Sequence, residues 1–323
     1  MTSISNVLAP LDFSIIIPAR NEEANIVRCL DSISQVEWDR EMYEVIVIDN
    51  GSSDRTVELA REKGARVTVR PELRIAGLRN LGATQSRGRI LAFLDADCAV
   101  TKQWLSAAAL YLKEGEDVVA FGSPVTVPEG GTWVQDAWFN VRGKPGVVSD
   151  ADWLESANLF VRRGPFFSVG GFNEELVTCE DYDLTQRLKR VGRLVSDHRV
   201  AALHYREPAT IKEFVKKEMW RGKNNYTGLL NRKIDKGELP SLVLPLFFLC
   251  FVISLLVLLA FSIGARTWGY LPYAGGLLLC WQAPILLVSA RKSRSGRLAT
   301  VFQLLVLFNA YFFARGLVVL RRG

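Results

Sequence analysis

Two aspartates, Asp95 and Asp97, directly follow the apolar run Ile90 to Leu94 in the string ILAFLDADC. An apolar run of this length, bounded by a glycine and by charge, is typical of a strand buried on both faces of a sheet. If the backbone stays extended, the two carboxylates point the same way and repel unless a cation lies between them. Mg²⁺ and Mn²⁺ prefer oxygen ligands and often join protein carboxylates to substrate phosphates. The pair could therefore hold a metal-bound diphosphate. The simpler interpretation is a turn that caps the helix expected from Thr101.

A second acidic group, formed by Glu180, Asp181 and Asp183, follows a glycine pair and opens another predicted helix. The helix macrodipole favours acidic residues in a first turn, so one or two of them need no functional explanation. Three together indicate a site in which one carboxylate acts as a general base. His204 could add a nitrogen ligand to the same metal, although a single histidine at a strand end is as often a surface hydrogen-bonding group.

The elements that would position these groups alternate between strand and helix. Apolar runs predict strands at residues 13–17, 43–48, 66–69, 90–94, 118–122 and 157–161. We expect Pro18 to end the first strand and Asn21 to cap the helix after it. This alternation predicts an α/β fold with a mostly parallel sheet and helices on both faces. Ligands bind outside the carboxyl ends of such strands, where the polar residues are Arg20, Glu22, Asp49, Asn50, Asp95 and Asp97.

Two later stretches are less regular. Residues 128–150 are rich in glycine, proline and aromatic residues, and we expect a mobile functional loop near the acceptor side there. The alternative is a helix followed by a turn. Residues 211–230 mix apolar and basic positions in the manner of a helix that lies in a membrane interface. Within that stretch Trp220 and Arg221 could instead face the site and hold a diphosphate.

Three apolar stretches, residues 241–263, 268–290 and 298–320, are each long enough to cross a bilayer, for which about 17 to 25 residues suffice. The third is the weakest, because it contains Asn309 and Arg315. The N-terminus resembles no signal peptide, so we expect the first domain to be cytoplasmic. The basic loop between the second and third stretches supports this orientation. We therefore expect a multi-pass protein of the inner (plasma) membrane, whose third apolar stretch either spans the membrane or lies in its interface.

The overall composition excludes several classes. The chain has 323 residues and five widely spaced cysteines, which show neither a disulfide framework nor the ligand spacing of a zinc site. Its formal net charge of +6 could suggest nucleic acid as a partner. Much of that excess lies beside the apolar stretches, where attraction to anionic lipid explains it, so we expect no nucleic-acid partner.

Four strings, in this order, resemble the family-2 glycosyltransferases of the GT-A fold. They are SIIIPARNEE, VIVIDNGSSDRT, GLRNLGATQSRGRILAFLDADC and GGFNEELVTCEDYDLTQRLKRVG. Together they extend from Ser14 to Gly192. The resemblance implies a GT-A nucleotide-binding domain over residues 1–208. We expect an amphipathic interfacial helix and linker over residues 209–240, and a transmembrane region of about three segments over residues 241–323.

The resemblance also implies roles for single residues. The donor would be a nucleotide sugar, carrying UDP or GDP, and its nucleotide would contact Pro18, Arg20, Glu22, Asp49, Asn50, Arg79 and Asn80. Asp95 and Asp97 would lie around Mg²⁺ or Mn²⁺ and the diphosphate, with Asp97 the more direct ligand. Asp181 would be the base that deprotonates the acceptor hydroxyl in one inverting displacement, with Glu180 and Asp183 in support.

This chain departs from the family pattern at two places. Many relatives have aspartate where this chain has Asn50, which leaves the nucleobase contact open. Processive polysaccharide synthases carry a Gln-x-x-Arg-Trp string, whereas this chain has only Glu218-Met219-Trp220-Arg221. That difference favours transfer of a single sugar over polymerisation. A membrane-docked site favours a lipid-linked acceptor, and a glycolipid is the other choice. The competing functions are a nucleotidyltransferase and a catalytically inactive, membrane-tethered nucleotide-sugar-binding module.

Overall fold

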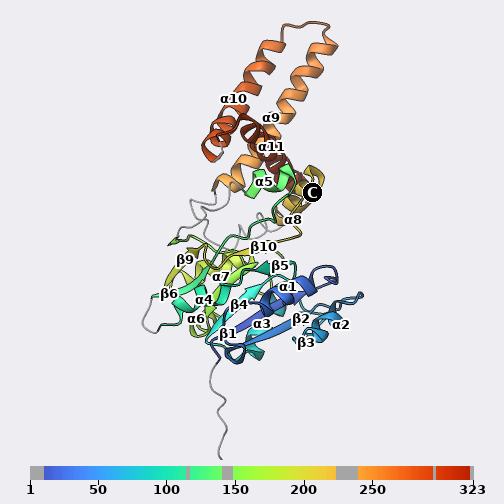
Figure 1. Cartoon of the computed structure of the whole chain (residues 1–323). Helices are drawn as coiled ribbons and strands as arrows, with labels where there is room; N and C mark the ends of the chain where they lie inside the picture. The colour runs from blue at the N-terminus through green and yellow to red at the C-terminus, as the bar shows by residue number, and fades with distance from the viewer. Residues whose placement is uncertain (1–10, 114–116, 140–147, 223–238, 294–295, 321–323) are drawn as a thin grey trace, which may run out of the picture. The chain divides into compact units, whose positions relative to one another are not determined.

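The computed structural model describes residues 11–113, 117–139, 148–222, 239–293 and 296–320. The chain divides into two compact units (Figure 1). The first comprises residues 1–128 and 144–206, and the second comprises residues 129–143 and 207–323.

An eight-stranded sheet forms the centre of the first unit, in the order β3-β2-β1-β4-β8-β6-β9-β7 (Figure 1). The first four strands pair in parallel, as do β6 and β9, whereas β8 runs antiparallel to both of its neighbours and β7 runs antiparallel to β9. The strands are β1 (Phe13–Ala19), β2 (Tyr43–Asp49), β3 (Arg66–Val69), β4 (Ile90–Leu94), β6 (Val118–Gly122), β7 (Val148–Asp150), β8 (Asn158–Arg162) and β9 (Arg193–Asp197). The predicted α/β fold with a mostly parallel sheet is confirmed.

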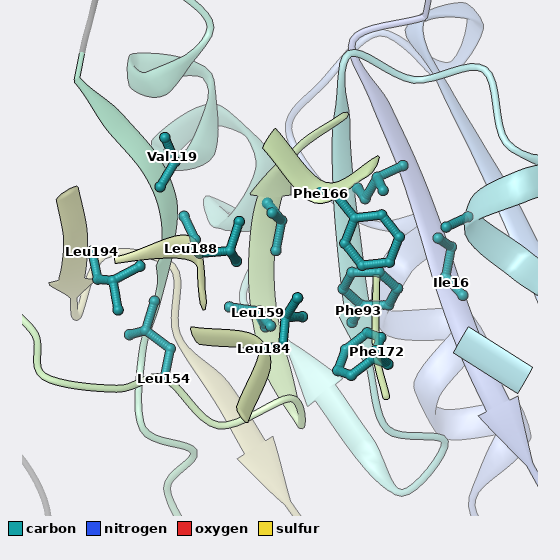
Figure 2. Close-up of a cluster of buried hydrophobic side chains, with 14 of the residues drawn as sticks. Ile16, Phe93, Val119, Leu154, Leu159, Phe166, Phe172, Leu184, Leu188 and Leu194 are labelled. Atoms are coloured by element: carbon teal, nitrogen blue, oxygen red, sulfur yellow. The ribbon is translucent and has the colours of Figure 1, made fainter. Parts of the chain in front are cut away.

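Helices pack against both faces of this sheet. Its helices are α1 (Ile26–Ser34), α2 (Thr56–Glu62), α3 (Ile75–Gln85), α4 (Trp104–Ala108), α6 (Arg163–Ser168) and α7 (Glu180–Leu188), with 3₁₀ turns η1 (Arg40–Met42) and η2 (Ala109–Tyr111). On one face, side chains of α3, α6 and α7 form a buried cluster with the strands, including Phe93 and Phe172, whose ring centroids lie 5.0 Å apart (Figure 2). On the other face Trp104 of α4 packs 4.7 Å from the ring of Phe160. Alternating side chains of the strands therefore fill two separate apolar layers.

Three local predictions differ from the structure. Pro18 does not end β1, because it stays in register with Ile48 and the strand continues to Ala19. Asn21 does not cap α1: it adopts φ 52°, and its side chain accepts a hydrogen bond from the backbone of Ser53. The expected irregular loop contains the helix α5 (Trp133–Phe139) and the strand β7, so the alternative of a helix and a turn was closer. Residues 140–147 of that stretch lie outside the described residues.

A second, two-stranded sheet was not expected. The strand β5 (Cys98–Val100) starts directly after the two aspartates and pairs antiparallel with β10 (Ala202–His204). The sequence placed His204 at a strand end, but it gave no sign of β5 or of the pairing, because segments of three residues are too short to show a period.

The second unit is helical. Its described helices are α5, α8 (Ile211–Gly222), α9 (Leu239–Gly264), α10 (Leu271–Lys292) and α11 (Leu298–Leu320). The last three are long and apolar enough to cross a membrane. The amphipathic helix predicted over residues 211–230 is present from Ile211 to Gly222, and residues 223–230 lie outside the described residues. Its buried Phe214 packs with Leu304 and Leu307 of α11, so this side of α8 is covered by protein.

Candidate active site

The strands β5 and β10 bring Asp97 and His204 together. Their pairing places His204 opposite Cys98, one residue after Asp97. The Nε2 atom of His204 lies 3.4 Å from Oδ1 of Asp97, and both side chains are largely buried. The backbone N–H of Tyr205 donates a 3.0 Å hydrogen bond to the carbonyl of Asp97, which fixes the following segment as well. Two of the three residues predicted to ligate a metal therefore meet at one point.

The third predicted ligand, Asp95, has a different neighbour. The backbone turns after β4, because the N–H of Cys98 donates to the carbonyl of Asp95 at 3.0 Å. The backbone is therefore not extended here, and the condition under which both carboxylates would aim at one point is not met. Oδ1 of Asp95 accepts a 2.8 Å hydrogen bond from Arg79, whereas Asp97 faces His204. A metal contact of Asp95 stays a prediction.

Arg79 connects the two acidic groups of the sequence. One terminal nitrogen of its guanidinium donates to Asp95 and the other donates to Oε1 of Glu180, each at 2.8 Å. The side chain is only 3% exposed, and it lies 5.4 Å from the centroid of the Phe172 ring. Burial alone favours the neutral form, but the carboxylates of Asp95 and Glu180 outweigh it and raise the pKa of Arg79. The guanidinium thus stays charged and joins the end of β4 to the start of α7.

Asn80 was expected to contact the nucleotide, yet its side chain holds the glycine turn before α7. Its Nδ2 donates to the carbonyl of Phe172 at 2.9 Å and to Oε1 of Glu174 at 2.8 Å, and its Oδ1 accepts from the N–H of Phe172 at 2.8 Å. A Cβ on Gly171 would lie 2.7 Å from that Oδ1, and Gly171 has φ +68°. Both the positive φ and the lack of room for a Cβ therefore require glycine at position 171. The neighbouring Arg79 and Asn80 position the acidic helix, and direct nucleotide contacts from them stay a prediction.

Asp181 and Asp183 lie in clearly different surroundings. Asp183 forms a two-pronged ion pair with Arg187 one turn later, at 2.6 and 3.0 Å. Asp181 accepts from the N–H groups of Tyr182 at 2.8 Å and Ser156 at 3.3 Å. Burial, with the adjacent Glu180 carboxylate, raises the pKa of Asp181 to about 6. Asp183 thus stabilises the helix, whereas Asp181 has the proton affinity of a general base.

The predicted nucleotide residues of the first two strands lie in adjoining loops. Arg20 donates to Oδ1 of Asn50 at 3.2 Å. The amide of Asn50 donates to three backbone carbonyls of residues 70–73, the shortest at 2.6 Å. Asp49 is fully buried and accepts from the N–H of Ser52 at 2.8 Å. Pro18 is buried in β1. These contacts order the loops, and the exposed Arg20 remains available to a ligand.

Glu22 and Arg206 show a contact that the sequence did not predict. Glu22 forms an ion pair with Arg206, two residues after His204. The guanidinium of Arg28 lies 4.0 Å from the centroid of the Tyr205 ring. The chain after β10 is thereby held on the loop that follows β1 and on α1. The only sequence signal was the proximity of Tyr205 and Arg206 to His204, since both partners lie more than 150 residues away along the chain.

Trp220 and Arg221, also predicted to bind the donor, belong to α8 of the second unit. Trp220 is 47% exposed. Arg221 donates to Glu218 at 2.8 Å, and Glu218 also accepts from Arg315. This ion pair lies within α8, and a role of Arg221 at the donor stays a prediction.

The side chains around Asp97 fit a divalent metal. An Asp97 oxygen, the Cys98 sulfur and a His204 nitrogen lie within 4.8 Å of one another. A carboxylate and an imidazole are suitable ligands for Mn²⁺. Cys98 would offer a thiol, a softer ligand that suits Mg²⁺ and Mn²⁺ less well than oxygen does. Asp97 and His204 are thus the fitting donors.

Comparison with known proteins decides the family. Residues 14–164 match the model of glycosyl transferase family 2. Glycosyltransferase AglE of Haloferax volcanii is 34% identical over 220 residues, which cover 65% of this chain and 71% of that protein. The chain belongs to glycosyl transferase family 2. The enzyme is a glycosyltransferase, and the nucleotidyltransferase and the inactive binding module are set aside.

Other relatives of this glycosyltransferase share less of their length with it. A β-monoglucosyldiacylglycerol synthase of Trichormus variabilis is 31% identical over 193 residues, which are 54% of this chain and 40% of that protein. Among solved structures, the mannosyltransferase PcManGT from Pyrobaculum calidifontis, in complex with GDP-Man and Mn²⁺, has a TM-score of 0.63 at 19% identity. The match covers 96% of this chain and 89% of that one. This likeness confirms the GT-A-like fold.

Proposed function

We propose that this enzyme moves one sugar from a nucleotide sugar to a membrane-associated acceptor, with inversion at the anomeric carbon and with the help of Mg²⁺ or Mn²⁺. One observation carries the proposal. Arg79 ties Asp95 to Glu180, and the residue after Glu180 is Asp181, whose pKa is raised to about 6. A carboxylate with the proton affinity of a base is thereby held beside the acidic end of β4.

In this mechanism Asp181 accepts the proton of the acceptor hydroxyl while that oxygen attacks the anomeric carbon. The bond between the anomeric carbon and the diphosphate breaks in the same step, and the nucleoside diphosphate leaves with the electron pair. A single displacement of this kind inverts the anomeric configuration. At neutral pH a group with a pKa near 6 is mostly ionised and is a stronger base than an ordinary aspartate.

Asp97 and His204 would hold the metal ion, and Asp95 stays a predicted further ligand. The ion would offset the negative charge of the diphosphate leaving group. The structure of PcManGT with GDP-Man and Mn²⁺ supports the use of a divalent metal. The nucleotide would lie against the loops of Arg20 and Asn50, and either UDP or GDP is compatible with these residues.

The acceptor is proposed to be a lipid-linked sugar or a glycolipid. Two features support it: the chain carries three helices apolar enough to cross a membrane, and one relative is named for the synthesis of a glucosylated diacylglycerol. The positive-inside argument supports a cytoplasmic site at the inner membrane. Transfer of one sugar fits the incomplete Gln-x-x-Arg-Trp string.

A donor screen tests this function. The purified full chain is incubated with UDP- and GDP-sugars, with Mn²⁺, with Mg²⁺ or with a chelator, and membrane lipid extract serves as acceptor. We expect one donor to raise the melting temperature only with metal, and NMR of the product to show the anomer opposite to that of the donor. Retention of the anomer would refute the mechanism, and full activity with chelator would refute the metal.

A further inference from the structure

The helix α11 has two different faces. The exposed apolar side chains Leu298, Phe302, Val306 and Phe313 form one stripe, because at about 100° per residue they fall within an arc of about 80°. The opposite face is covered by protein: Leu304, Leu307, Ala314 and Val318 are buried there. The covering elements include α8 and α5, since Leu304 and Leu307 form one apolar cluster with Phe214 and Ala137.

The helix α8 follows α11 over most of its length. Phe214 meets Leu304 and Leu307, Glu218 accepts hydrogen bonds from Arg315 at 2.8 and 3.1 Å, and a Cβ on Gly222 would lie 3.1 Å from Val318. The outward side of α8 carries Lys212, Glu213 and Lys216, all exposed. If α11 crossed the bilayer, these charges would lie at the depth of the acyl chains, where charged groups are costly and rare.

The contacts of α11 with α9 and α10 also argue against a helix that crosses the bilayer. The helix α10 ends at Lys292 and α11 begins at Leu298, so α11 starts on the side of the bilayer where α10 ends and α9 begins. Gly316 lies 18 residues further on, about 27 Å along the helix axis at 1.5 Å per residue. A crossing helix parallel to α9 would bring Gly316 to the level of Val257, equally far from the start of α9. Val257 is instead 46% exposed.

The residues of α9 that Gly316 does meet lie much nearer its start. A Cβ on Gly316 would lie 2.8 Å from Leu249 and 3.1 Å from the carbonyl of Pro245, about 9 to 15 Å from the beginning of α9. Phe312, one turn earlier, packs on Phe248 with ring centroids 6.4 Å apart. The helix α11 therefore runs across α9 and does not advance along it. The loop between α9 and α10 lies far from α11 (Figure 1).

A polar contact ties α11 to the middle of α10. Asn309 and Gln282 exchange two side-chain hydrogen bonds of 3.0 Å, and Trp281 donates to Asn309 at 3.2 Å. Trp281 in turn stacks on Phe251 of α9, with ring centroids 5.5 Å apart. Between Asn309 and Gly316 the contact level on α9 thus moves from Phe251 back to Leu249 and Pro245, toward the start of α9, whereas a crossing helix would advance away from that start.

We propose that α11 is not a third membrane span but lies embedded in the leaflet from which α9 and α10 rise, with its exposed stripe against lipid and its C-terminal end on the side of α8. The partner of this surface is the lipid bilayer. Arg291 and Lys292, exposed at the end of α10, match the anionic headgroups expected at the same level. The surface continues directly from two helices that are themselves suited to the membrane.

Sidedness of the full chain in membrane vesicles tests the proposal. Three reporters are compared: Lys212→Cys on α8, Ala265→Cys in the loop between α9 and α10, and a short tag after Gly323. We expect an impermeant reagent to reach the first and third from one side and Ala265→Cys from the other. A tag on the side of Ala265→Cys would mean a third span and overturn the proposal, as would three reporters on one side. If replacing the five native cysteines for this labelling prevents folding, split fluorescent-protein tags at the same three places give the same comparison.

Depth measurements give a second, independent test. Fluorophores are attached at Phe302 and Phe313, and quenching by lipids labelled at known depths is compared. The two positions lie 11 residues apart, about 16 Å along the helix. We expect nearly equal depths, whereas a depth difference close to that length would overturn the proposal. Leu256 and Ile263, exposed on α9, are the matched control pair and should differ by about 10 Å.

Discussion

The raised pKa of Asp181 makes the pH dependence of the transfer step a test of the mechanism. A base with a pKa of about 6 is about nine-tenths ionised at pH 7 and about one-tenth ionised at pH 5. The rate of transfer should therefore fall roughly tenfold between these pH values. An ordinary aspartate, with a pKa of 3.8, would remain mostly ionised over the same range and leave the rate nearly constant.

The substitution Asp181→Asn keeps the size of the side chain and removes its basicity. We expect transfer to fall by at least 10² and at most about 10⁴, the range typical of a positioned base. Donor and metal binding should persist, because the contacts of Asp181 are with the backbone of Ser156 and Tyr182. Asp183→Asn is the matched control from the same turn. It loses the ion pair with Arg187, and its effect on the rate should be milder.

The assay measures single-turnover transfer under saturating donor between pH 5 and pH 8, with donor affinity determined at each pH. A flat profile, or near-normal turnover in Asp181→Asn beside intact donor binding, would assign the base elsewhere. Stability supplies a separate check. The folded pKa lies above the unfolded value, so the stability contributed by the protonated carboxyl is present below about pH 4 and is lost as pH rises through about 6. At pH 7 Asp181→Asn should therefore melt no lower than the parent enzyme.

Three further predictions concern the metal, the glycine turn and the membrane unit. Asp97→Asn should abolish Mn²⁺-dependent donor binding in calorimetry while leaving the melting temperature of the metal-free protein nearly unchanged; retained metal dependence would contradict the site. Asn80→Ala removes three hydrogen bonds and should lower the free energy of unfolding by about 1 to 3 kcal/mol in urea titration; no loss would mean that the turn is held by other contacts. Glu218→Gln leaves Arg315 without its counter-charge and should lower the free energy of unfolding by about 3 to 5 kcal/mol. The exposed Glu213→Gln is the control and should lower it little. Equal losses of unfolding free energy in the two variants would contradict a buried ion pair.

The sequence predicted the strands and the acidic groups well because each depends on local pattern. Five-residue apolar runs bounded by glycine and by charge, such as Ile90 to Leu94, are typical of buried strands, and their ends mark where a ligand binds. The family resemblance then selected Asp181, rather than Glu180 or Asp183, as the general base. The structure shows Asp181 in a different environment from Asp183. That distinction arises from Ser156 and Glu180, which surround one carboxylate and not the other.

What could not be predicted depends on contacts between distant parts of the chain. Arg79 and Asn80 were assigned to the nucleotide because they follow the family pattern, yet their partners Glu180 and Phe172 are about 100 residues away. The pairing of β5 with β10 likewise joins segments too short for a periodic signal, although His204 was suspected from its chemistry alone. The Asp95 and Asp97 pair in the sequence likewise shows no sign of the arginine that binds only the first of them.

The buried guanidinium of Arg79 also has a consequence for how this enzyme could diversify. Its ion pairs connect Asp95 with Glu180 inside the protein, whereas the side chains of Arg20 and Asn50 belong to loops that bond with one another and with residues 70–73. No hydrogen bond or ion pair described for these residues joins the two networks. With the outer loops at the nucleotide and Asp181 as the base, as proposed, substitutions in those loops would alter which nucleotide is preferred while the reacting groups keep their alignment, whereas a change at Arg79 would disturb the chemistry for every donor. Donor preference should accordingly drift among related enzymes much faster than the arginine itself.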